Sequence, residues 1–131
     1  LEAREEDVAA ARLEAGAYDV AVLDAPWYPA ALSHWLAVAA AAVRSGGRIL
    51  LALLPALHRP SAQADRSAIL ARARTLGSVS IEPGRLRYAT PRFEREALAT
   101  AGLGVPAAWR RADLLEIALE RPSRAEFVAP T

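Results

Sequence analysis

The stretch that decides the fold is YDVAVLDAPWYP, residues 18–29. Its first half, Tyr18–Leu23, is a short apolar run with β-branched valines, which is typical of a strand that a parallel sheet buries on both faces. Asp24 follows directly, and Pro26 and Pro29 interrupt regular structure. We therefore expect a buried strand that ends in a polar loop stiffened by proline.

The residues after this loop predict a helix and a second strand. Apolar residues recur at helical spacing from about Ala31 to Val43, and the Ser-Gly-Gly turn at residues 45–47 predicts the helix end. Residues 48–54 form another continuous apolar run, which Pro55 stops. Because a strand, a helix and a strand follow one another, this region predicts a βαβ unit.

The flanking segments extend the same alternation of helices and strands. Good helix formers fill residues 2–15, and Gly16 is a typical stop signal. Downstream of the βαβ unit, Ser61 suits the N-cap of a helix that keeps apolar residues on one side until Gly77. We therefore expect one helix on either side of the unit.

The last third of the chain predicts two strands around a short helix. Residues 78–82 suit a third strand that ends at a Pro-Gly turn. The Thr-Pro pair at residues 90–91 resembles the N-cap and N1 of a helix that runs to Gly102. Residues 112–120 are expected to form the last strand, and residues 121–131 an irregular C-terminal tail.

This order of elements predicts an α/β fold with a mainly parallel sheet and flanking helices, over residues 1–120. In such sheets ligands bind beyond the carboxyl ends of the strands. The residues that follow the strands at 18–23 and 48–54 are therefore the candidate site.

Composition limits the class of protein. With 131 residues, 53% of them hydrophobic, the chain is long enough for one domain with a core. The absence of cysteine excludes disulfides, thiolate zinc sites and a cysteine nucleophile, and it suits a cytoplasmic protein. No apolar run approaches the roughly 20 residues of a bilayer span. A net charge of +1 gives no reason to expect strong nonspecific binding to nucleic acid, so any such binding must be local.

The loop DAPWYP, residues 24–29, resembles the D-P-P-W or N-P-P-Y signature of S-adenosylmethionine-dependent amino-methyltransferases. In that family the signature follows the fourth strand, and a helix, a Gly-Gly turn, the fifth strand, another helix and a terminal antiparallel strand pair come next. Residues 1–120 match this order. The resemblance implies the C-terminal half of a Rossmann-like methyltransferase.

The resemblance also implies roles for the loop residues. An exocyclic amine conjugated to a ring is a poor nucleophile because its lone pair is delocalised. In the resembling enzymes an acidic or amide side chain and the next backbone carbonyl accept the two amine hydrogens, and these would be Asp24 and Ala25. Ala25 replaces the first proline of the signature but keeps its carbonyl, and Pro26 completes the turn. Trp27 would stack on a flipped base, a contact worth about 1–3 kcal/mol.

The resemblance implies S-adenosylmethionine as cofactor, but the 131 residues contain no glycine-rich turn after a strand. The G-x-G at residues 102–104 follows a helix and is better interpreted as a helix stop. We therefore expect the isolated chain to be inactive and to need a cofactor-binding half from upstream sequence or a partner chain. The alternative is a noncatalytic interaction module, in which Asp24 caps a turn and Trp27 covers core.

Further residues are candidates for substrate binding at the same edge. Tyr28, His58 and Arg59 lie at or after predicted strand ends, and neither histidine of the chain has partners at metal-binding spacing. The acceptor is a nucleic acid base such as adenine, a protein side-chain amide or a small molecule. A set of arginines with an aromatic between them suits nucleic acid phosphates or a solvated rim: Arg59, Arg85, Arg87 and Arg92, with Tyr88. The segment Trp109–Arg111, just before the last strand, suits base stacking in the same way, or Trp109 packs on the sheet edge.

The strand Tyr18–Leu23 is also a candidate interface. In the resembling fold it lies beside a first strand that is absent here, so its edge would be unpaired. Exposed strand edges invite pairing with another chain. We therefore expect a homodimer, a bound partner chain or a covering segment at this edge.

Overall fold

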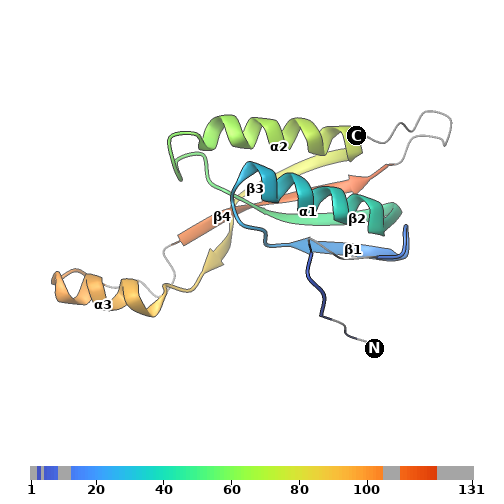
Figure 1. Cartoon of the computed structure of the whole chain (residues 1–131). Helices are drawn as coiled ribbons and strands as arrows, with labels where there is room; N and C mark the ends of the chain where they lie inside the picture. The colour runs from blue at the N-terminus through green and yellow to red at the C-terminus, as the bar shows by residue number, and fades with distance from the viewer. Residues whose placement is uncertain (1–2, 4, 9–12, 105–109, 121–131) are drawn as a thin grey trace.

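The computed structural model describes residues 3, 5–8, 13–104 and 110–120, and it confirms an α/β fold. Helices α1 and α2 lie against one face of a sheet, and α3 projects beyond the end of the sheet (Figure 1). The elements in chain order are β1 (Tyr18–Leu23), α1 (Pro29–Ala42), β2 (Val43–Leu53), α2 (Ala62–Leu76), β3 (Gly77–Tyr88), α3 (Arg92–Thr100) and β4 (Arg110–Leu119).

The expectation of a mainly parallel sheet is wrong. The strand order is β1-β2-β4-β3, and only β1 and β2 are parallel, whereas β4 runs antiparallel to both β2 and β3. A parallel connection needs a crossover that packs back on the sheet. The helix between β3 and β4 projects away from the sheet instead, so the chain returns beside β3 in the opposite direction (Figure 1).

The directions of the strands decide which loops meet. Because β4 is antiparallel to both of its neighbours, β3 runs in the same direction as β2 and β1. The carboxyl ends of β1, β2 and β3 therefore lie at one edge of the sheet. The loops that follow β1 and β2 carry the predicted site residues.

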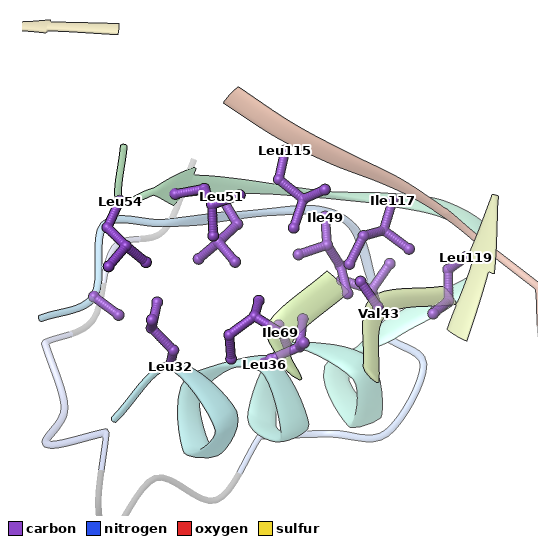
Figure 2. Close-up of a cluster of buried hydrophobic side chains, with 14 of the residues drawn as sticks. Leu32, Leu36, Val43, Ile49, Leu51, Leu54, Ile69, Leu115, Ile117 and Leu119 are labelled. Atoms are coloured by element: carbon purple, nitrogen blue, oxygen red, sulfur yellow. The ribbon is translucent and has the colours of Figure 1, made fainter. Parts of the chain in front are cut away.

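The core lies between this sheet and the two helices that cover it. Alternate residues of the two central strands point at α1 and α2 and are fully buried, among them Leu51 and Ile117. Figure 2 shows Leu32 and Leu36 of α1 and Ile69 of α2 facing these strand residues. Removing this apolar surface from water is the main stabilising term, at about 25 cal/mol per Å².

β1 has the predicted bounds but not the predicted burial. Val20 and Val22 are 50% and 74% exposed, so burial on both faces is wrong for this strand. β1 is the outer strand of the described sheet, and α1 and α2 cover only one face. Ala21 and Leu23, on the alternate positions, pack against the core.

The predicted N-terminal helix is wrong for the part of it that is described. Residues 3, 5–8 and 13–15 are not helical. A helix of this length is marginal in water unless tertiary packing stabilises it. Gly16 does adopt the left-handed region, with φ 64°, and its N–H donates to the Ala41 carbonyl at the end of α1.

β3 is longer than its predicted range of 78–82. The strand continues through Pro83 and Gly84 to Tyr88, and its pairing with β4 shifts between Glu82 and Leu86. Gly84 has φ 62° there, and its N–H donates to the Asp113 carboxylate at 2.7 Å. The Pro-Gly pair therefore forms an irregularity within a strand rather than the end of one.

The helix boundaries differ from the sequence pattern by a few residues. α1 begins at Pro29 and ends before the Ser-Gly-Gly segment, which lies within β2 where the pairing with β1 is irregular. The Thr-Pro prediction for α3 is wrong in register, because Pro91 has an extended ψ of 148° and occupies the N-cap. Ser61 is at the N-cap of α2 as predicted, although its hydroxyl donates to the Asp65 carboxylate.

The predicted tail at residues 121–131 and Trp109 lie outside the described residues. Among the residues that the structure describes, no helix has the length and apolar character needed to cross a membrane.

Candidate functional site

Most of the predicted site residues meet at the shared carboxyl edge of β1, β2 and β3. Asp24 follows β1, and Trp27 and Tyr28 lie in the loop that leads to α1. His58 and Arg59 lie in the loop between β2 and α2. A ring contact between Trp27 and His58 and a cation contact between Arg59 and Tyr28 join the two loops.

A hydrogen bond joins the Asp24 carboxylate to β3, the other outer strand, at the same carboxyl edge of the sheet. The Tyr88 hydroxyl, at the end of β3, donates to Asp24 Oδ1 at 2.8 Å. Burial, this hydrogen bond and the charge of Asp24 together raise the pKa of Tyr88 to about 12. Tyr88 is therefore a neutral donor at physiological pH. Asp24 Oδ2 accepts no hydrogen bond from any described residue.

The backbone after Asp24 forms a tight turn. Ala25 is only 3% exposed and belongs to the core cluster, and the Tyr28 N–H donates to the Pro26 carbonyl at 2.8 Å. Within the described part of the chain, no group donates to the Ala25 carbonyl. A nearly buried carbonyl without a donor is rare and costs free energy. Asp24 and Ala25 thus carry two adjacent acceptors to which no described residue donates, of which the Asp24 carboxylate is exposed and the Ala25 carbonyl is buried.

Trp27 is fixed within a small aromatic cluster. Its indole N–H donates to the Ala52 carbonyl of β2 at 3.2 Å. Its ring centroid lies 4.8 Å from that of His58 and 5.9 Å from that of Tyr88, and both rings are nearly perpendicular to the indole. The half-buried indole therefore has a defined orientation beside Asp24, and its stacking on a base stays a prediction.

Tyr28 and Arg59 form the rim of the site. The Arg59 guanidinium lies 5.5 Å from the centroid of the Tyr28 ring, and the tyrosine is 67% exposed. Arg59 also donates to the Asp65 carboxylate at 2.9 Å and to the Ser61 hydroxyl at 3.2 Å. Hydrogen bonds from Arg59 and then Ser61 lower the pKa of Asp65. The Arg59 charge is thus already compensated, which weakens its predicted role toward a substrate anion.

Two residues of this edge were not assigned to the site from the sequence. The sequence pattern predicts a strand that ends at residue 82, which leaves Tyr88 beyond it, whereas β3 runs to Tyr88 and brings its hydroxyl to Asp24. The alternation of Leu86, Arg87 and Tyr88 is the signal that β3 continues. Asp65 was missed because it lies on α2, and its spacing from Arg59 carries no motif. His34 lies elsewhere on α1, where a ring nitrogen is 3.4 Å from the Val8 carbonyl.

No family model, no curated protein and no solved structure matches this chain. No group of three or more His, Cys, Asp or Glu residues that could hold a metal ion occurs in the described ranges. What the site does chemically is therefore argued from its geometry.

Proposed function

We propose that this chain is the acceptor-binding half of an S-adenosylmethionine-dependent amino-methyltransferase that acts on a planar exocyclic amine such as adenine N6. The observation that carries the proposal is the pair of adjacent acceptors, Asp24 Oδ2 and the Ala25 carbonyl, for which no described residue supplies a donor. An amine with two N–H groups matches two such acceptors, and its binding requires the buried Ala25 carbonyl to become accessible. The pair lies at the carboxyl edge of the parallel strands, where ligands bind in α/β sheets.

The two acceptors would raise the nucleophilicity of the bound amine. When both amine hydrogens donate to Asp24 and Ala25, the nitrogen becomes more nearly tetrahedral and its lone pair is less delocalised into the ring. Tyr88 holds the carboxylate by its other oxygen, at 2.8 Å, and so orients Oδ2. Preorganised acceptors of this kind do not have to reorganise during the reaction.

The arrangement of strands supports the same proposal. The parallel pair β1 and β2, connected through α1, is followed by the antiparallel pair β3 and β4. This is the order of elements that the resemblance implies after the amine signature. The signature loop itself lies between β1 and α1, as it does in the resembling family.

The cofactor would be held by residues other than those described. When bound, S-adenosylmethionine supplies a methyl group on a sulfonium, but no glycine-rich turn follows a strand in the part of the chain that the structure describes, so we assign no cofactor-binding residue here. The outer edge of β1 suits the missing half, because a cavity of about 680 Å³ lies beside it. Its lining includes the exposed Val20 and Val22 of β1 and residues of α1. The chain's own N-terminal segment, with Val8 and Leu13, lines it too.

The proposal is tested in the protein completed by its cofactor-binding half, with transfer of labelled methyl from S-adenosylmethionine to adenine-containing oligonucleotides as readout. Asp24→Ala should lower kcat by 10²-fold or more, in the range typical for loss of one preorganised hydrogen-bonding group. Asp24→Asn keeps an acceptor oxygen and should retain much more activity. Calorimetric affinity for the cofactor should be the same in both variants. Full activity of Asp24→Ala would refute the proposal.

A noncatalytic interaction module is the second candidate, and the exposure of Val20 and Val22 on an outer strand favours it. An exposed apolar strand edge is a site for partner binding without any chemistry. Double replacement of Asp24 and Trp27 by alanine separates the two functions. If the folded double variant keeps the biological function of the protein, the module is correct.

A further inference from the structure

The charges of the chain are segregated in a way that the net charge of +1 hides. Residues 84–104 and 110–111 carry six arginines against two glutamates, a net charge of +4. The rest of the chain carries ten arginines against thirteen carboxylates, a net charge of −3. We call residues 84–104 and 110–111 the arginine arm. It comprises the last part of β3, the whole of α3 and the first residues of β4.

The arginine arm contributes little to the core. Its helix α3 extends beyond the end of the sheet (Figure 1), and none of the residues of α3 is buried. Phe93, at the start of that helix, is 70% exposed. A segment that buries so little apolar surface gains little stability from packing. Three arginines of the arm already form ion pairs with glutamates: Arg85, Arg92 and Arg110. The other exposed side chains of the arm are available to a binding partner.

The arm contains a pair of like charges that folding alone would avoid. Arg87 of β3 lies directly opposite Arg111 of β4 in the register of the two strands. Like charges directly opposite each other destabilise a sheet. In the described ranges no carboxylate forms an ion pair with either residue, or with Arg95 of α3. A bound anion between Arg87 and Arg111 would relieve the repulsion.

We propose that the arginine arm binds the phosphate backbone of a single-stranded nucleic acid. Arginine donates in a planar fork that matches phosphate oxygens. The exposed ring of Phe93 among these arginines offers a surface on which a base can stack, a contact worth about 1–3 kcal/mol. An acidic peptide would use the arginines but not the ring, so the combination favours a nucleic acid.

The arm leads directly to the candidate site. Tyr88 belongs to the arm, and its hydroxyl is the donor to Asp24. A nucleic acid bound along the arm would therefore pass the carboxyl edge of the sheet, where Asp24 Oδ2 and the Ala25 carbonyl lie. Binding to the arm is independent of methyl transfer, and only the delivery of a base to Asp24 rests on the proposed function. The two proposals can therefore fail separately.

The experiment measures the affinity of the chain for short fluorescent single-stranded DNA and RNA by anisotropy over a range of salt concentrations. The test variant is Arg87→Gln/Arg111→Gln. Each phosphate contact contributes a salt exponent of about 0.7, so the variant should lower the salt slope by about 1.4 and the affinity about 25-fold at about 0.1 M salt. Its melting temperature should be unchanged or higher, because the like-charge pair is removed.

The matched control is Arg72→Gln/Arg74→Gln, which removes the same charge from α2. Its affinity should stay within about twofold of the unmodified chain, as expected for a local contact. Absence of oligonucleotide binding, or an equal loss in both double variants, would overturn the proposal. Equal competition by polyglutamate at matched charge would assign the arm to acidic proteins and would overturn it too. If the test variant does not fold, Arg95→Gln should lower the affinity about fivefold, and no change would be decisive against the arm.

Discussion

The helix-covered face of the sheet and the edge that carries Asp24 are held together in different ways. On the covered face, Leu51 and Ile117 are fully buried and are fixed by packing with many neighbours. At the edge, Asp24 is exposed and Trp27 and Tyr88 are half-buried, and a few directional contacts fix them. Substitutions on the covered face should therefore change stability, whereas substitutions at the edge should change binding.

The largest expected effect is on the covered face. Leu51→Ala should lower the free energy of unfolding by about 2–5 kcal/mol, because it removes buried apolar surface and leaves a cavity. Phe93→Ala, on the exposed α3, should change it by less than about 0.5 kcal/mol. Urea denaturation of the two variants measures both values. A similar loss in both would mean that the arm is packed as tightly as the core.

A smaller effect on stability is expected for the hydrogen bond between Tyr88 and Asp24. Tyr88→Phe removes the hydroxyl donor of Asp24 and should cost about 1 kcal/mol or less, since the contact is partly exposed. A double-mutant cycle with Asp24→Ala isolates the coupling, which should be about 0.5 kcal/mol or more for residues in contact. Strictly additive losses would show that the two side chains do not interact in solution.

The sequence predicts the positions of the strands and helices on the covered face, but not the directions of the strands. Strand and helix positions on the covered face follow from continuous or periodic apolar residues, and Tyr18–Leu23 is predicted to the residue. Strand direction does not follow from these patterns, because a helix after a strand indicates a parallel return only if it packs on the sheet. α3 carries a helical pattern but projects away from the sheet, so β4 is antiparallel.

The candidate site was predictable only for the residues that directly follow a predicted strand. Asp24, Trp27, His58 and Arg59 follow predicted strands, and the rule that such ends share an edge brings them together. Tyr88 was not predictable, because a Pro-Gly pair usually marks a turn. Here the strand continues past it with a shifted register. The described residues of the predicted N-terminal helix are not helical, because propensity alone is a weak guide for a helix of this length.

The ionisation of Tyr88 should make the stability of the chain depend on pH in the alkaline range. Its pKa is raised from 10.0 to about 12 in the folded chain, so the folded state binds this proton more tightly than the unfolded state. The associated stability is fully present below pH 10 and is lost as the pH rises toward 12. Stability measured across this window should fall less steeply in Tyr88→Phe. The same slope in both proteins would contradict the raised pKa.

The smallest effect on stability is expected for the ion pair between Arg59 and Asp65. Hydrogen bonds from Arg59 and Ser61 lower the pKa of Asp65 from 3.8, so their stabilising contribution is present above that value and is lost as the pH falls through the lowered pKa. Asp65→Asn should flatten this part of the acid unfolding curve only slightly, because an ion pair that solvent still reaches contributes little. Comparison of the two acid titrations measures the effect, and a large change would mean that the rim supports the fold.

The most direct test of the amine site uses the chain without any cofactor. Adenosine is titrated into isotope-labelled protein, and the backbone amide signals of Ala25 and Tyr88 and the indole N–H signal of Trp27 are followed by NMR. Inosine, which lacks the exocyclic amine but keeps the ring and ribose, is the control ligand. We expect saturable shifts at these three residues with adenosine and much smaller shifts with inosine. Equal shifts with both ligands, or none at these residues with adenosine, would contradict the assignment of Asp24 and Ala25 as amine acceptors.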